Sequence, residues 1–239
     1  MAEQEVIKHT KKIYKTWFSK EHSFFHKLGE FLIEIFIIVF AVSLSVWFHN
    51  RSDYTHQQED VRLFLQGLKA DLGHDIMEMQ EDKDSYLNQK FIFSYIAGIK
   101  LKDLPSRDTI VKYRSWIFNT TQLNPNDGRF EGFKSSGKIG TIENKELQND
   151  IMDLYQENIP ALLSSTRGYI SSKQKFFDYF VKNYKRLTDS TGNMISMLKN
   201  DEMLNIASSL SSPQEILDRY AACILLMNKI ISEIDKEYH

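Results

Sequence analysis

Two glutamates near the start of an apolar run carry the strongest chemical signal in this sequence of 239 residues. Glu34 lies inside an almost wholly apolar stretch from residue 28 to residue 48, about one helical turn after Glu30. A carboxylate in hydrocarbon is costly, so it normally has a partner, a path to water or a proton. Three roles are open for Glu34: contact with the cytoplasmic headgroup layer, an interhelical hydrogen bond in an oligomer, or ion coupling of the kind used by motor stator subunits.

A group of possible metal ligands follows further along the chain. Four side chains are spaced at i, i+3, i+4 and i+7, so a helix would place them on one face: Asp71, His74, Asp75 and Glu78. Carboxylate and imidazole groups on one face can bind a divalent cation. No second pair of ligands accompanies them, and mixed charges are usual on the solvated face of a helix. The sequence therefore favours a solvated charged face, and no metal or other cofactor is expected.

The segment Ser135-Ser136-Gly137 could be a nucleophilic or phosphate-binding loop by composition. It lacks the glycine spacing of a G-x-S-x-G elbow and of a P-loop. Glycine and serine are frequent in tight turns. We therefore predict a turn that packs Phe130 and Phe133, and no catalytic residue.

The elements that must position these residues begin with a basic leader and an apolar span. The leader, residues 1–27, contains six lysines and three glutamates, a local charge of +3, and residues 28–49 form a candidate transmembrane helix. At about 1.5 Å per residue, a helix of roughly 20 residues crosses a hydrocarbon layer of roughly 30 Å. Aromatic residues alternate with lysines in the leader, which favours a helix in the headgroup layer; the alternative is a loose tail whose aromatics meet a partner.

The lysines before the span predict that the N-terminus is cytoplasmic and that the C-terminal domain lies on the other side of the membrane. A cleaved signal peptide is the competing interpretation, but residues 46–50 lack a small-x-small cleavage pattern. Ser43, in the outer half of the span, could assist helix packing. Together with Glu30, Glu34 and the exit residue Trp47, it forms the predicted set of membrane and assembly residues.

Residues 50–239 have the pattern of a helical domain. Apolar residues recur at helical spacing from residue 61 onwards, which predicts that the span continues as a long helix with Gly67 and Gly73 as weak points. A shorter helix is expected over residues 108–118. Turn-forming residues are concentrated in residues 119–141, which we expect to be the main irregular segment.

Helix is expected to resume at Asn144, with a kink or split at Pro160. Polar connectors are expected at residues 188–193 and 208–212, the second leading through Ser212 and the following proline into a last helix. With 42% hydrophobic and 26% charged residues, the chain can form one anchor and one domain with a core. The predicted fold class is all-α: a single transmembrane helix that extends into a helical bundle.

The charge and the cysteine content exclude some functions. The formal charge of the chain is -2, so residues 28–239 carry about -5 once the +3 of the leader is subtracted. A mildly acidic domain argues against nucleic acid as a partner. Cys223 is the only cysteine, so no intramolecular disulfide can form.

Two segments carry a resemblance to known proteins. The first contains Gly29-Glu30, Glu34 and an exit with Trp47, Asn50 and Arg51, and the second runs from Phe133-Lys134-Ser135-Ser136-Gly137-Lys138-Ile139 through Asn144 to Leu154-Tyr155. They resemble a family of single-pass inner-membrane proteins of unknown function that is widespread in Bacteroidota, although the exit departs from that family's more usual Asn-Asn-Trp order. The resemblance implies a bacterial inner-membrane anchor and a helical periplasmic domain, with no catalytic residues to carry over.

These observations predict a non-enzymatic protein: an oligomeric scaffold or accessory subunit of an envelope complex, in contact with the lipid bilayer and with copies of itself or a multi-spanning partner. One alternative is a stator-like subunit in which Glu34 couples to ions. Another is a periplasmic ligand-sensing bundle, which an apolar cavity lined by Phe176, Phe180 and Tyr184 would favour.

Overall fold

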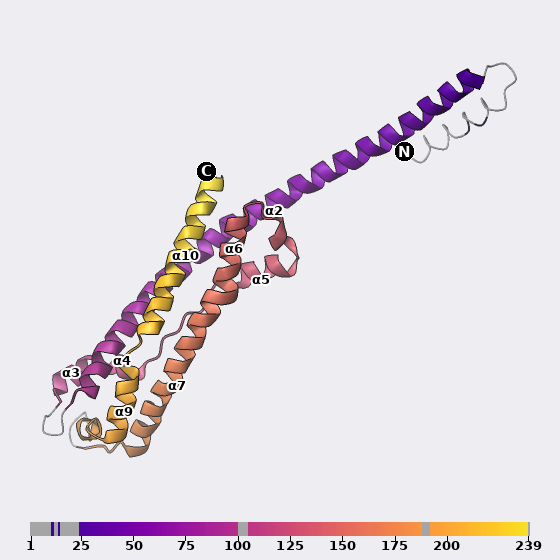
Figure 1. Ribbon diagram of the computed structural model, residues 1–239. Coiled ribbons are helices and arrows are strands. Elements are labelled where there is room, and N and C mark those ends of the chain that lie inside the picture. Colours follow the sequence, from indigo (N-terminus) through magenta and orange to yellow (C-terminus); the bar gives the residue numbers. More distant parts are fainter. Residues whose placement is uncertain (1–10, 12–13, 15–23, 100–104, 188–191, 239) are drawn as a thin grey trace. The chain divides into compact units, whose positions relative to one another are not determined.

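The computed structural model describes residues 11, 14, 24–99, 105–187 and 192–238 (Figure 1). The described residues form helices and turns and contain no strand, which confirms the all-α class. The elements are α2 (Phe24–Ala97), α3 (Arg107–Lys112), α4 (Arg114–Phe118), α5 (Gly128–Ser135), the 3-10 turn η1 (Lys138–Thr141), α6 (Lys145–Asp153), the π-helical turn η2 (Leu154–Asn158), α7 (Ile159–Asn183), α8 (Met194–Met197), α9 (Asp201–Leu210) and α10 (Gln214–Tyr238).

Helix α2 is 74 residues long and contributes to two compact units, residues 1–60 and residues 61–239. No proline occurs in it, so every residue can supply its backbone hydrogen bond. The predicted weak points Gly67 and Gly73 both lie inside the helix without interrupting it. The helix predicted for the leader lies outside the described residues, apart from residues 11, 14 and 24–27.

The second unit is held together by two apolar clusters. In Figure 1, α7 and α10 run alongside the later part of α2. The first cluster joins α2, α6, α7 and α10 and includes Leu68, Leu147 and Tyr220. The second joins the end of α2 to α3, α4, α7, α8 and α9 and includes Phe93 and Phe176. Each fully buried large apolar side chain contributes roughly 1.5–3 kcal/mol, so these clusters stabilise the bundle.

The prediction of one irregular segment over residues 119–141 is wrong in its second half. Residues 119–127 are irregular, but α5 and η1 follow. The ring of Phe130 stacks on Tyr155 at 4.4 Å, and that of Phe133 stacks on Phe64 at 4.0 Å. This burial outweighs the low helix propensity of the glycines in α5.

The helix predicted over residues 108–118 is two short helices, α3 and α4, that meet at Tyr113. The hydroxyl of Ser106 caps α3 by accepting a hydrogen bond from the backbone N–H of Thr109. The connector predicted at residues 208–212 begins too early, because α9 continues to Leu210.

The predicted helix start at Asn144 and the disturbance at Pro160 both occur. The Asn144 side chain accepts a hydrogen bond from the backbone N–H of Leu147 and caps α6. Pro160 has no N–H to offer the carbonyl of Gln156, and the helix passes through the wider π turn η2 before α7 begins. The π turn therefore changes the helical phase between α6 and α7.

Candidate functional site

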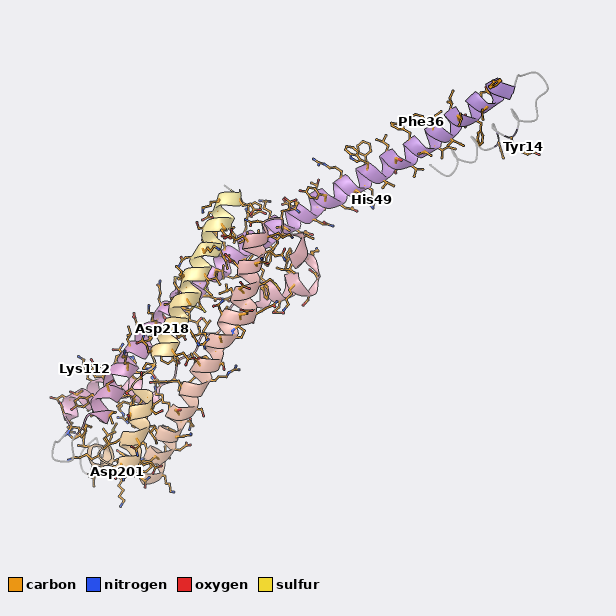
Figure 2. All side chains as sticks on the ribbon, in the orientation of Figure 1. Tyr14, Phe36, His49, Lys112, Asp201 and Asp218 are labelled. Atoms are coloured by element: carbon orange, nitrogen blue, oxygen red, sulfur yellow. The ribbon has the colours of Figure 1, made fainter. Side chains whose placement is uncertain are left out.

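The first part of α2 has exposed apolar side chains. Within the described residues, α2 is the one helix that is long and apolar enough to cross a membrane, and 6% of its most apolar window is buried. Figure 2 labels Phe36 in this segment, where the ring is 68% exposed. A core helix of a soluble domain would bury such a window. Length and composition are shared by membrane anchors and N-terminal signal sequences.

Glu34 differs from its neighbours in this segment. Its side chain is 5% exposed, whereas that of Ile33 is 61% exposed. The other predicted assembly residues, Glu30, Ser43 and Trp47, are exposed.

The prediction that Asp71, His74, Asp75 and Glu78 form a solvated face of α2 is wrong for Asp75. His74 is exposed as expected, but Asp75 is completely buried. Asp75 accepts hydrogen bonds from the backbone N–H of Asn126 at 3.2 Å and from its side-chain amide at 2.5 Å. Burial raises the pKa of Asp75, and the bonds from Asn126 oppose that rise. The carboxylate therefore binds the irregular segment that follows α4 and does not face solvent.

Neighbouring acids of α2 bind the same segment. Asp71 pairs with Arg129 at 2.8 Å, and Glu78 accepts a hydrogen bond from the backbone N–H of Asn124 at 2.9 Å. We call Asp71, Asp75, Glu78 and Asp82 the acidic stripe. Its contacts run from Thr121 to Arg129, so the stripe holds the irregular segment and the start of α5 against α2.

Asp82 links the acidic stripe to α10 as well as to the irregular segment. It accepts a hydrogen bond from the hydroxyl of Tyr220 at 2.7 Å and another from the hydroxyl of Thr121. Tyr86, one turn further along α2, donates to the carbonyl of Thr121 at 3.0 Å. Burial raises the pKa of Tyr220 and of Tyr86, which keeps both hydroxyls protonated donors.

Lys173 is a buried amine that the sequence analysis did not select. Its side chain is 2% exposed and donates to the side-chain carbonyl of Gln89 at 2.6 Å, to the Trp116 carbonyl at 2.7 Å and to the Asn119 carbonyl. Three acceptors match the three N–H bonds of a protonated lysine. Burial lowers the pKa of Lys173 to about 7. The signal for this residue is its spacing, because it continues the buried positions 159, 162, 166 and 176 of α7.

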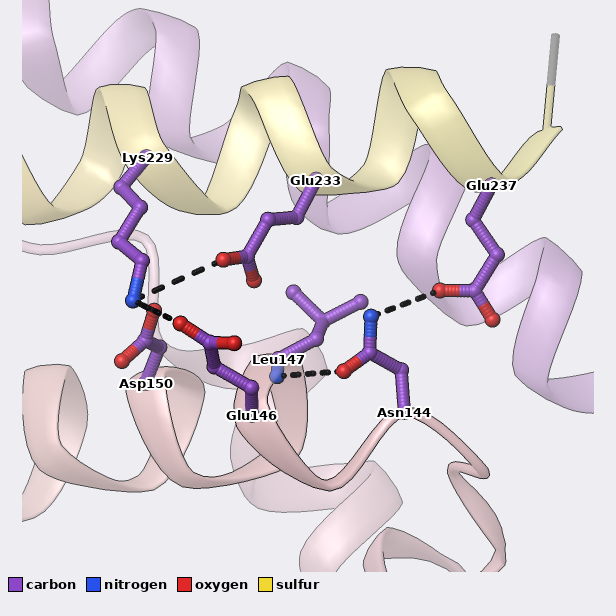
Figure 3. A network of polar contacts seen from close by, with 7 residues as sticks. All are labelled: Asn144, Glu146, Leu147, Asp150, Lys229, Glu233 and Glu237. Carbon is purple, nitrogen blue, oxygen red and sulfur yellow. Dashed lines mark hydrogen bonds and ion pairs between the residues drawn. The ribbon is translucent and has the colours of Figure 1, made fainter.

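A second polar cluster joins α6 to α10 (Figure 3). The ammonium of Lys229 lies 2.8 Å from Glu146, 2.7 Å from Asp150 and 3.6 Å from Glu233. Ligand oxygens of the three acids lie within 4.8 Å of one another, close enough to hold a cation. Lys229 already supplies positive charge at this position, and its bonds to Asp150 and Glu146 raise its pKa. Burial raises the pKa of Glu233. The cluster acts as an ion-paired clamp between two helices.

The serines of the predicted turn have local structural contacts. Ser135 is the last residue of α5 and Ser136 is its C-cap, and the Ser136 hydroxyl donates to the carbonyl of Phe133 at 2.7 Å. Gly137 follows with φ of 74°, a left-handed conformation that glycine adopts without strain. This geometry is that of a helix end.

An open groove lies between α4 and α7. It is lined by Arg114, Ser115, Phe118, Asn119, Phe177 and Phe180, and we call it the aromatic groove. The Phe118 ring meets that of Phe180 at 4.8 Å. Phe176 is fully buried against Phe93, and Tyr184 stacks on Phe180. The three residues named for a sensor cavity therefore do not share one, since Phe176 lies in the core and Phe180 lines this surface groove.

Comparison with protein-family models, with curated proteins and with solved structures finds no match to this chain.

Proposed function

We propose that this protein is a non-enzymatic, membrane-anchored scaffold or accessory subunit of an envelope protein complex. The observation that carries the proposal is the exposed apolar segment of α2. Phe36, Phe40 and Trp47 are each more than half exposed, and a continuous apolar surface of this length needs lipid or protein to cover it. A bilayer covers all sides of such a helix at once, which favours an anchor.

The polar side chains of the second unit support a structural role. The acidic stripe binds residues 121–129, Lys173 binds three carbonyl groups, and Lys229 joins α6 to α10. Buried polar groups used in this way stabilise one arrangement of helices. In the described part of the chain, the polar groups best placed for chemistry are thus engaged in holding the bundle together.

The proposal includes a location and an orientation. The lysines of the leader favour a cytoplasmic N-terminus, and the second unit then lies in the periplasm of a bacterium whose inner membrane holds the anchor. Glu30, Glu34, Ser43 and Trp47 are the proposed assembly residues, in contact with a second copy or with a multi-spanning partner.

A stator-like role for Glu34 is the second candidate. The observation that favours it is the burial of this carboxylate within an apolar segment in which most other side chains are exposed. A shielded carboxyl in a membrane can hold a proton and release it when the surroundings change. In this alternative, the multi-spanning partner supplies the path for the ion.

The test is gentle detergent extraction of the tagged full chain, followed by mass measurement of the particle and identification of co-purifying proteins. We expect a homo-oligomer or a complex with a membrane protein, and a lone monomer would contradict the proposal. Glu34→Gln is compared with Glu30→Gln, which changes an exposed carboxylate one turn away. Loss of the complex in the Glu34 variant alone supports assembly through this residue, whereas an intact complex that has lost function supports ion coupling.

A further inference from the structure

The end of the second unit that carries α3, α4 and the end of α7 is unusually basic. The described residues 105–119 and 177–187 contain six basic and two acidic side chains, a net charge of +4 in a chain whose total is -2. The basic residues are Arg107, Lys112, Arg114, Lys182, Lys185 and Arg186, and the acidic ones are Asp108 and Asp178. Residues 194–204, with α8 and the start of α9, lie at the same end (Figure 2) and add Lys199, Asp201 and Glu202, so the three segments together carry +3. This end therefore attracts anions, although the formal charge of the whole chain is negative.

Several of these cations are available to an outside partner. Arg114, Lys182 and Arg186 are exposed, and none forms an ion pair with another described residue. Asp178, the acid next to them on α7, accepts a hydrogen bond from Gln174 at 2.7 Å. Asp178 keeps its negative charge, which is included in the sum above, and it forms no ion pair with these three cations.

Apolar side chains are interleaved with this charge. Val181 is 59% exposed, Leu187 is 60% exposed and Phe177 is 41% exposed. Phe177 and Phe180 also line the aromatic groove, as does Arg114. Residues 177, 180 and 181 lie on one face of α7 because they are three and four positions apart.

We propose that this end of the second unit docks on an anionic phospholipid surface. Lysine and arginine side chains bind lipid phosphates while nearby aliphatic and aromatic side chains insert at the boundary between headgroups and acyl chains. The complementarity of charge selects an anionic surface. The exposed side chains of Val181 and Leu187 can insert among the lipid headgroups, because lipids rearrange around them. The open aromatic groove can hold a segment of an acyl chain beside Arg114.

This inference goes beyond the proposed anchor, because it assigns a second lipid contact to a different part of the chain. The full chain is placed in nanodiscs of neutral phosphatidylcholine and mixed with vesicles of phosphatidylcholine alone or with added phosphatidylglycerol. Flotation of the vesicles on a density gradient measures how much protein they bind. We expect binding to the phosphatidylglycerol vesicles, weakened by salt, and little binding to neutral vesicles.

The variants separate charge from apolar contact. Lys182→Glu with Arg186→Glu is expected to weaken binding about 25-fold or more, since each basic residue near an anionic surface contributes about 1 kcal/mol. Val181→Ser with Leu187→Ser, which changes two exposed side chains, is expected to weaken it as well. The matched control is Arg167→Glu with Lys236→Glu, which makes the same change of charge at exposed positions elsewhere.

Equal binding to neutral and anionic vesicles, no binding to either, or equal loss in the control pair would overturn the inference. Circular dichroism shows whether a variant is folded, and the salt dependence of the unaltered protein tests the charge term without any variant. A failure of this inference does not contradict the anchor proposal, because the transmembrane segment is already inserted in the nanodisc. Failure of the anchor proposal instead appears as protein that does not enter nanodiscs.

Discussion

At the scale of single residues, Lys173 shows how a charged side chain can be part of a core. Its amine lies among three carbonyl groups from α2, α4 and the residue after α4, at a distance in sequence of more than fifty residues from each. A lysine can occupy such a position only because every N–H bond has an acceptor. Its role is to fix the end of α4 to α7.

The lowered pKa of Lys173 predicts a specific pH dependence. Burial lowers the pKa from 10.5 to about 7 in the folded protein. Between these two values the unfolded chain binds a proton that the folded protein does not, so the contribution of Lys173 to the free energy of unfolding rises with pH over this window. We expect Lys173→Met to remove this rise, and to destabilise the second unit by about 2–4 kcal/mol by leaving carbonyl groups unpaired.

The measurement is urea unfolding of the full chain in detergent at several pH values, with tryptophan fluorescence as the signal that reports unfolding. Lys175→Met is the control, because Lys175 is exposed and two residues away. The same pH slope in the Lys173 variant and in the unaltered protein would show that Lys173 does not titrate in this window.

At the scale of elements, the acidic stripe explains how residues 119–127 stay in place without regular structure. Their backbone donors cannot pair within a helix, and two of them, the N–H groups of Asn124 and Asn126, are satisfied by carboxylates of α2. Gly67 is needed nearby, because a Cβ at this position would collide with the Arg129 guanidinium. The absence of a side chain lets Arg129 lie across the helix and reach Asp71.

We predict that Asp75→Ala loosens this segment. It removes both hydrogen bonds to Asn126 from a buried position, which we expect to cost about 1–3 kcal/mol. Hydrogen exchange of the backbone amides of residues 124–128 should become faster, while exchange in α10 changes less. His74→Ala, one position away and exposed, should stay within about 0.5 kcal/mol of the unaltered protein. Unchanged exchange after Asp75→Ala would mean that the segment is held by its apolar contacts alone.

At the scale of the whole molecule, the charge of the leader and the exposed segment of α2 predict a topology that labelling can measure. Cys223 is 1% exposed and should not react in the folded protein, so Cys223→Ser provides a background for single cysteines. In spheroplasts, a membrane-impermeant maleimide should label Asp218→Cys and not Lys11→Cys, because the two exposed positions are expected on opposite sides of the membrane.

Both positions should react after the membrane is permeabilised, which controls for local accessibility. Labelling of Lys11→Cys in intact spheroplasts would show that the orientation is the reverse of the one predicted. Release of the protein from membranes by alkaline carbonate would instead argue against an integral anchor.

The sequence by itself determined the features that depend on local pattern. The apolar span, the all-α class, the start of a helix at Asn144 and the disturbance at Pro160 follow from hydrophobic periodicity and from the missing N–H of proline. Each depends on residues within a few positions of one another. Such features can be deduced from sequence because neighbours along the chain are neighbours in a helix.

Only the tertiary structure decided which polar residues are buried and what they contact. Asp75 and Lys173 have the residue type of a solvated surface, and their positions on buried stripes become meaningful only once the partners Asn126, Gln89 and Trp116 are known. The helical state of α5 likewise depends on Phe130 stacking on Tyr155, 25 positions away. The physical reason is that burial and hydrogen bonding between distant segments outweigh the local preferences of glycine, aspartate and lysine.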